Sequence, residues 1–234
     1  MFEGKTLIGV GCSHVFAPLG EDINPVTCHE RSWVKKLEKL GNFKDSINIS
    51  LEGASNRRSE RVLMEYLETH DVSNLVIAFG LTDLSRFEIP LVDETFSHLY
   101  TMKSFGPWSV NTEYTSDFRE LAFMETLYGK FHSTQYETVM INRTLLFLNV
   151  FLNKLDIEHY FIELHCHGGS IIDNTFGIKL PLINFKNIDG DPTNAIRYII
   201  EQGHVPDYTG HFNDDAHEFL AELFYNRIKE IKNV

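Results

Sequence analysis

The sequence predicts a single α/β domain in three layers, an α/β/α sandwich with a flavodoxin-like parallel sheet in the middle. Short apolar runs such as residues 74–79 have the continuous hydrophobicity of strands that are covered on both faces. Segments with apolar residues at helical spacing alternate with these runs. Strands that alternate with helices are typical of parallel sheets with right-handed crossovers. No repeat, low-complexity tract or linker divides residues 1–234.

The first third of the chain supplies two strands and two helices. Residues 6–10 form an apolar run that suits a buried strand, and a polar, proline-containing loop over residues 17–27 follows. Helical spacing begins near residue 30, and a glycine at residue 41 is a plausible end for that helix. Residues 46–51 alternate as a short strand, and the turn at residues 53–56 leads into the second helix.

The middle third contains the clearest strand and the least regular segment. Residues 74–79 are a continuous apolar run that ends at a glycine. Residues from about 88 to 117 are aromatic and irregular, and a loop of that length in a compact domain is typical of a lid or a binding wall. A long helix is expected from about residue 118 to 155, with a break near Gly129.

The last third closes the sheet. Residues 159–164 predict a strand, which a histidine-rich turn at residues 165–169 follows. Helical spacing then indicates a helix over residues 191–202 and a closing amphipathic helix over residues 214–232.

Composition excludes several classes of protein. The formal net charge of −12 argues against a nucleic-acid binder, because neutralising phosphates needs a basic surface. The widely spaced Cys12, Cys28 and Cys166 form no disulfide framework and fit a reducing compartment. No signal peptide is visible, and no apolar run approaches the about 18 residues that span a bilayer. We therefore expect no membrane partner, and a cytoplasmic protein or one released without a signal peptide; the sequence leaves the oligomeric state open.

Polar clusters stand where this topology places the carboxyl ends of the strands, the edge at which open α/β sheets bind ligands. They are Ser13, residues 53–56, residues 80–83 and residues 165–167, and a fifth cluster, residues 210–213, precedes the last helix. A serine becomes reactive when a base takes its proton, and histidine is the usual base near neutral pH. Amide donors are also needed to hold the oxyanion.

The order and spacing of these clusters resemble the SGNH hydrolases, also called GDSL esterases and lipases, over nearly the whole chain. Residues 11–14 (Gly-Cys-Ser-His) resemble the first block of that family, and residues 52–56 (Glu-Gly-Ala-Ser-Asn) the second. Residues 80–83 (Gly-Leu-Thr-Asp) resemble the third block, and residues 207–213 the last. The turns at residues 53–56 and 82–87 resemble most a subset of the family that occurs in tailed bacteriophages, which implies the cytoplasm of a host cell.

The resemblance implies a role for each matching residue. Ser13 corresponds to the nucleophile, His211 to the general base, and Asp207, or else a backbone carbonyl, to the group that orients the imidazole. The main-chain amides of Ser13 and Gly53, with Thr82, correspond to the oxyanion donors. The implied activity is that of a serine esterase that removes a small acyl group, such as acetyl from a carbohydrate, and needs no cofactor.

Three positions depart from the family pattern. Cys12 replaces an aspartate that is structural in the family, and Thr82 stands where an asparagine donor is usual. Asp207 lies one residue further from the histidine than the family spacing. Loss of one oxyanion donor typically costs roughly 10²–10³ in rate. The alternative is therefore a weak or inactive member that uses the old pocket for binding, as a phage accessory protein.

Further side chains near these turns are candidates for substrate binding: Asn56, Asp83, Arg86, His165 and His167. Each has a structural alternative, since Asn56 and Asp83 could cap helices and Arg86 could lie on a solvated helix face. The histidine-rich turn at residues 165–167 also suggests zinc, but its spacing is not that of a helical zinc site, and we expect no metal. A metal-assisted hydrolase is thus the weakest alternative.

Overall fold

A computed structural model describes residues 1–18, 22–92, 100–105, 122, 126, 133–165, 174–175, 178–207 and 210–232, with residues 87–92, 100–105, 134 and 174–175 described by their backbone alone. Its centre is a sheet in which five strands run parallel in the order β2-β1-β3-β6-β9. These strands are β1 (Thr6–Val10), β2 (Asp45–Asn48), β3 (Leu75–Leu81), β6 (Glu158–Glu163) and β9 (Leu182–Ile183). Counted along the chain this is the order 2-1-3-4-5, the flavodoxin-like arrangement, which confirms the predicted fold class.

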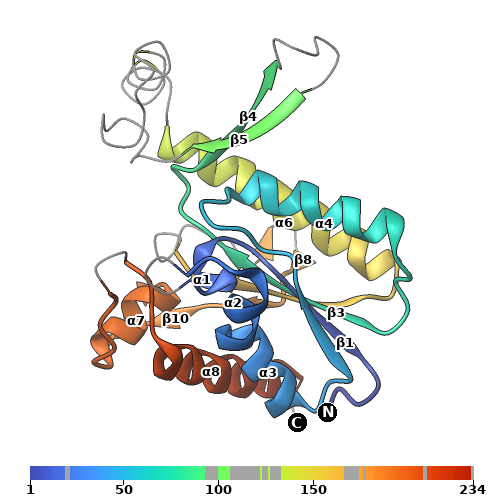
Figure 1. Ribbon diagram of the computed structural model, residues 1–234, viewed down its shortest axis with the longest axis vertical. Helices are drawn as coiled ribbons and strands as arrows, with labels where there is room; N and C mark the ends of the chain where they lie inside the picture. The colour runs from blue at the N-terminus through green and yellow to red at the C-terminus, as the bar shows by residue number, and fades with distance from the viewer. Residues whose placement is uncertain are drawn as a thin grey trace.

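Helices cover both faces of this sheet, as Figure 1 shows. On one face lie α3 (Trp33–Gly41) and α8 (Asp214–Lys232), whose contact includes the edge of Trp33 against Phe224 with ring centroids 4.9 Å apart. On the other face lie α4 (Asn56–Thr69) and α6 (Thr134–Lys154). Each face has its own apolar core, and alternate residues of β1 enter one or the other: Leu7 the first and Ile8 the second. The three predicted layers are therefore present.

Side chains with capping hydrogen bonds mark the first turns of α3 and α4. The side chain of Ser32 accepts the main-chain N–H of Lys35 at the start of α3, and Ser55 does the same for Arg58 at the start of α4. Two helices were not expected: α1 (Ser13–Phe16), which lies at the predicted turn, and α2 (Pro25–Arg31), which occupies the end of the predicted loop over residues 17–27. The Asn24 cap of α2 and the proline at its first position are a helix-start signal that the prediction took for a loop.

The expected lid-like insertion differs in part from the prediction. Within residues 88–117 the chain forms an antiparallel hairpin of β4 (Phe87–Val92) and β5 (Tyr100–Phe105), so this part is regular, while residues 93–99 and 106–117 lie outside the described residues. Of the helix expected over residues 118–155, α6 covers the C-terminal part, and Gly129 lies outside the described residues.

The remaining elements are short. They are α1 (Ser13–Phe16), α7 (Ala195–Glu201), β7 (Asn174–Thr175), β8 (Ile178–Lys179), β10 (Phe185–Lys186) and β11 (Pro192–Thr193). The helix predicted from residue 191 begins only at Ala195, because the preceding residues pair with β10 and Asn194 then caps the helix. In the described part of the chain, no helix combines the length and the apolarity that crossing a membrane requires.

The carboxyl ends of the strands point to the left in Figure 1, toward α1, and both chain termini lie at the opposite end. The described residues that directly follow β1, β3 and β6 thus belong to the end of the molecule away from the termini.

Candidate active site

Ser13 is the first residue of α1, directly after the turn that ends β1. That turn needs glycine at residue 11, where φ is +150° and a Cβ atom would lie 2.7 Å from the carbonyl oxygen of Gly80. The glycine allows the end of β1 to pack against the end of β3. Ser13 itself is 4% exposed.

Three side chains hold the short α1 helix by its carbonyl groups. The indole N–H of Trp33 donates to the carbonyl of His14 at 3.1 Å, and the amide of Asn48 donates to that of Val15 at 2.8 Å. The guanidinium of Arg31 reaches the carbonyl of Ala17 at 3.3 Å. These bonds come from α3, β2 and α2, so Ser13 stands on a support that is fixed from several elements.

The second and third motif turns are joined by one side chain. Asn56 donates from Nδ2 to the carbonyl oxygen of Thr82 at 3.1 Å, and its Oδ1 accepts the main-chain N–H of Thr82 at 2.8 Å. Thr82 is completely buried, and Gly53 has a φ of +68°, in the left-handed region. Asn56 therefore braces the turn that carries Thr82, and its expected contact with substrate stays a prediction.

Asp207 and His211 close a tight turn before α8. The N–H of Asp207 donates to the carbonyl of His211 at 2.7 Å, and the N–H of His211 donates to Oδ1 of Asp207 at 3.1 Å. Gly210, with a φ of +82°, lets the chain turn between them. Despite the extra residue in this motif, the carboxylate of Asp207 therefore reaches the main chain of His211.

The ring of His14 has the rings of two other histidines as neighbours. Its centroid is 5.5 Å from that of His165 and 5.8 Å from that of His211, and Phe212 packs against it at 5.9 Å. The first motif turn, the end of β6 and the turn before α8 therefore meet beside Ser13. Sequence reasoning did not select His14, since no local signal indicates that its ring joins these turns.

Burial controls the charge of two of these imidazoles, those of His14 and His211. The pKa of His211 is lowered mainly by burial, although the charges of Glu52 and Asp207 oppose this shift. Burial also lowers the pKa of His14 well below its usual value, and the neighbouring His165 and His211 add to this effect. His211 is therefore neutral at neutral pH and can accept a proton.

Two predicted binding residues lie at the same edge. Oδ2 of Asp83, after β3, is 3.8 Å from Nδ1 of His165, after β6. Arg86 follows in the same turn, and its charge acts on His14, Asp83 and His211. The predicted His167 lies outside the described residues. Among the residues that the structure describes, no group of three or more His, Cys, Asp or Glu side chains could hold a metal ion.

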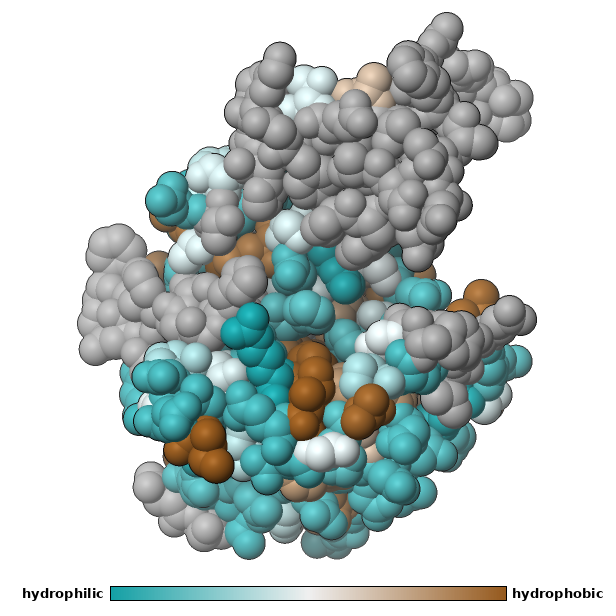
Figure 2. All heavy atoms as spheres, turned by 90° about the vertical axis from the view of Figure 1, so that its left-hand side faces the viewer, coloured by the Kyte–Doolittle hydropathy of each residue, from teal (hydrophilic) through white to brown (hydrophobic). Residues whose placement is uncertain are grey.

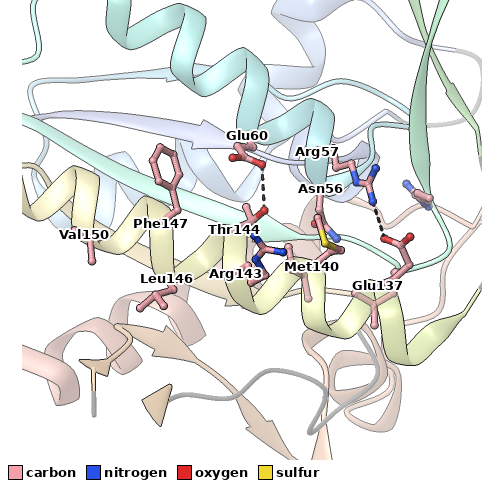
Figure 3. Close-up of a pocket in the computed structure, with 13 residues that line it drawn as sticks. Asn56, Arg57, Glu60, Glu137, Met140, Arg143, Thr144, Leu146, Phe147 and Val150 are labelled. Atoms are coloured by element: carbon pink, nitrogen blue, oxygen red, sulfur yellow. Dashed lines mark hydrogen bonds and ion pairs between the residues drawn. The ribbon is translucent and has the colours of Figure 1, made fainter. Parts of the chain in front are cut away.

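A pocket of about 850 Å³ borders this edge between α4 and α6. Figure 3 shows its walls: Asn56, Arg57 and Glu60 come from α4, and α6 supplies the facing side chains. An ion pair joins Arg57 to Glu137 at 3.5 Å, and Thr144 donates to Glu60 at 3.2 Å. Asn56 and Arg86 line this pocket, whereas Ser13 and His211 do not.

Figure 2 views the molecule from the left-hand side of Figure 1. The coloured part of this surface is largely hydrophilic, and its hydrophobic side chains form small, separate groups.

Comparisons with known proteins give matches among solved structures alone. No protein-family model matches the sequence, and no curated protein matches it either. The psychrotrophic esterase EstA from Pseudoalteromonas sp. is 12% identical over 98% of this chain and 100% of that chain, with a TM-score of 0.49. TesA is 14% identical over 97% and 99% of the two chains, with a TM-score of 0.46.

A third structure is a carbohydrate esterase whose active site displays divergent catalytic and non-catalytic binding functions. It is 9% identical over 97% of this chain and 65% of that chain, with a TM-score of 0.46. At these TM-scores the matches assign no role to any residue of this chain.

Proposed function

We propose that this chain is a serine ester hydrolase of the SGNH type that removes a small acyl group, with an acetylated carbohydrate as its substrate class. The observation that carries the proposal is the contact between the rings of His14 and His211, whose centroids are 5.8 Å apart. This contact puts the helix of the candidate nucleophile, Ser13, beside the turn of the candidate base. The two segments come from opposite ends of the chain.

The reaction follows the usual course of serine hydrolysis. Ser13 Oγ attacks the acyl carbon while His211 takes its proton. The main-chain N–H groups of Ser13 and Gly53 and the side-chain hydroxyl of Thr82 hold the oxyanion. Water then releases the acyl group from Ser13. Asp207 favours the charged form of His211 during proton transfer, which agrees with the direction in which its charge moves the pKa of that histidine.

Three further observations support the proposal. Burial keeps His211 neutral, as a general base must be before the reaction. The bonds from Trp33 and Asn48 fix the α1 helix, and a fixed nucleophile is what positioning requires. The coloured surface in Figure 2, which is largely hydrophilic, suits a carbohydrate ester. We also propose, from the similar turns at residues 53–56 and 82–87, that the protein belongs to the bacteriophage subset of the family.

The test is hydrolysis of 4-nitrophenyl acetate and 4-nitrophenyl butyrate by the wild type and by Ser13→Ala and His211→Gln. Loss of the base should reduce kcat/KM about 10²–10⁴-fold, and loss of the nucleophile at least as much. Ser73→Ala, an exposed serine in the loop before β3, is the matched control and should keep the wild-type rate. Wild-type activity in Ser13→Ala would contradict the proposal, and an inactive wild type that binds acetylated glycans would favour the non-catalytic alternative.

A further inference from the structure

The ends of β3 and β6 bring a carboxylate and an imidazole together. Pairing of the two strands runs to Leu81 opposite Glu163, and the N–H of His165 donates to the carbonyl of Leu81 at 3.0 Å. Two residues beyond the last pair stand Asp83 and His165, whose Oδ2 and Nδ1 atoms are 3.8 Å apart. Their side chains are 25% and 36% exposed, so a substrate at the surface can reach them.

Asp83 has a fixed orientation and a charge. Its Oδ1 accepts the main-chain N–H of Ser85 at 2.7 Å and also the Ser85 hydroxyl. Burial raises the pKa of Asp83, but the hydrogen bonds from Ser85 and the charges of His165 and Arg86 outweigh burial and lower it overall. An ionised carboxylate beside an imidazole favours the imidazolium form. His165 thus has a counter-ion in place.

His14 is a ring neighbour of both His165 and His211, at ring-centroid distances of 5.5 and 5.8 Å. The low pKa of His14 keeps its ring neutral. His165, which has the carboxylate of Asp83 beside its ring, is therefore suited to start the reaction charged, whereas burial keeps His211 neutral.

We infer that His165 is a second acid–base residue of this site, and that Asp83 positions it to give a proton to the leaving alcohol. The inference rests on the proposed function, because it assigns one step of the same ester hydrolysis. General acid catalysis matters most when the leaving group departs as a strong base, as the alkoxide of a sugar hydroxyl does.

Each proton that a side chain gives or takes in acylation is returned in deacylation. In acylation, Ser13 Oγ bonds to the acyl carbon and its proton passes to His211, while the ester C–O bond breaks and the departing oxygen takes a proton from His165. In deacylation, a water oxygen bonds to the acyl carbon and its proton passes to His165. The bond to Ser13 Oγ then breaks, and Ser13 takes back the proton that His211 held. Both imidazoles return to their starting states.

The experiment compares two acetyl esters that differ in the leaving group. 4-Nitrophenolate leaves without a proton, whereas the ethoxide of ethyl acetate needs one. We expect His165→Gln to lower kcat/KM about 10²-fold or more for ethyl acetate and less than about 10-fold for 4-nitrophenyl acetate. Asp83→Asn should shift the same ratio in the same direction, and to a smaller extent, because it leaves the imidazole in place.

Controls separate this inference from the proposed function. His70→Gln changes an exposed histidine at the end of α4 and should leave the ratio of the two rates at its wild-type value. Deacylation also uses His165, so the His165→Gln variant should show a burst of nitrophenol as acetyl-enzyme accumulates. Equal losses on both esters, or a normal ratio in both variants, would overturn the inference and leave the proposed function standing. A wild type that no fluorophosphonate labels at Ser13 would overturn the proposed function, and the inference with it.

Discussion

Glu163 is a buried carboxyl group at the end of β6, and its replacement by glutamine should remove a pH dependence of stability. The side chain is 2% exposed, and its Oε1 atom has no hydrogen-bond partner among the described residues. Burial raises the pKa of Glu163 from 4.5 to about 8. The folded protein therefore keeps this group protonated at neutral pH, whereas the unfolded chain ionises it.

The magnitude follows from linkage. At 1.36 kcal/mol per pH unit, a pKa that rises from 4.5 to about 8 corresponds to roughly 5 kcal/mol. Because the folded pKa is the higher one, the stability is fully present below the unfolded pKa of 4.5 and is lost as pH rises through about 8. Glu163→Gln cannot ionise, so the stability difference between the variant and the wild type should grow across this interval.

Urea denaturation of both proteins at several pH values between about 4.5 and 8.5 measures this difference. The difference need not be zero at about pH 4.5, because glutamine brings its own unpaired polar group, but it should grow as the pH rises toward about 8.5. Parallel stability curves over the whole interval would refute it.

Burial of His217 lowers its pKa from the ordinary value of 6.5 to about 3. The wild type should therefore lose roughly 5 kcal/mol of stability as the pH falls from 6.5 toward 3. Denaturation curves of His217→Leu should lack this loss. Gly11→Ala places a Cβ atom 2.7 Å from a backbone oxygen and should cost about 1–3 kcal/mol more in thermal denaturation than Gly4→Ala, which has a positive φ but open space. Asn56→Ala removes two buried hydrogen bonds to the main chain of Thr82 and should cost about 1–3 kcal/mol in urea denaturation. Equal midpoints for Gly11→Ala and Gly4→Ala would contradict the packing rationale, and a wild-type midpoint for Asn56→Ala would contradict the hydrogen-bond rationale.

Strong periodicity made the large elements predictable. The apolar run at residues 74–79 corresponds to β3, in which every residue is buried, because a central parallel strand is covered on both faces. The closing helix begins and ends as expected at residues 214 and 232, since its apolar positions repeat at helical spacing over several turns.

Short elements carried too little signal. The strand β9 has two residues, and it exists because Leu182 and Ile183 pair with Phe161 and Ile162. Two residues cannot show a period, so only the tertiary contact defines that strand. The hairpin of β4 and β5 was not predicted, because the aromatic residues of this segment are equally compatible with an irregular loop.

The site was predictable as a set of turns but not as a set of contacts. Motif spacing indicated which turns meet at the carboxyl edge of the sheet. The bond between Asn56 and the main chain of Thr82 and the ring contacts of His14 depend on how far side chains reach between neighbouring turns. Sheet twist and packing set such distances, and the spacing of motifs along the sequence does not predict them.

The measurement that tests the central claim most directly is the site of labelling by a fluorophosphonate, read by mass spectrometry of the intact and digested protein. We expect one adduct on Ser13, none in Ser13→Ala, and labelling slowed about 10²–10⁴-fold in His211→Gln. A folded wild-type protein that carries no adduct on Ser13 would contradict the claim that this serine is the nucleophile.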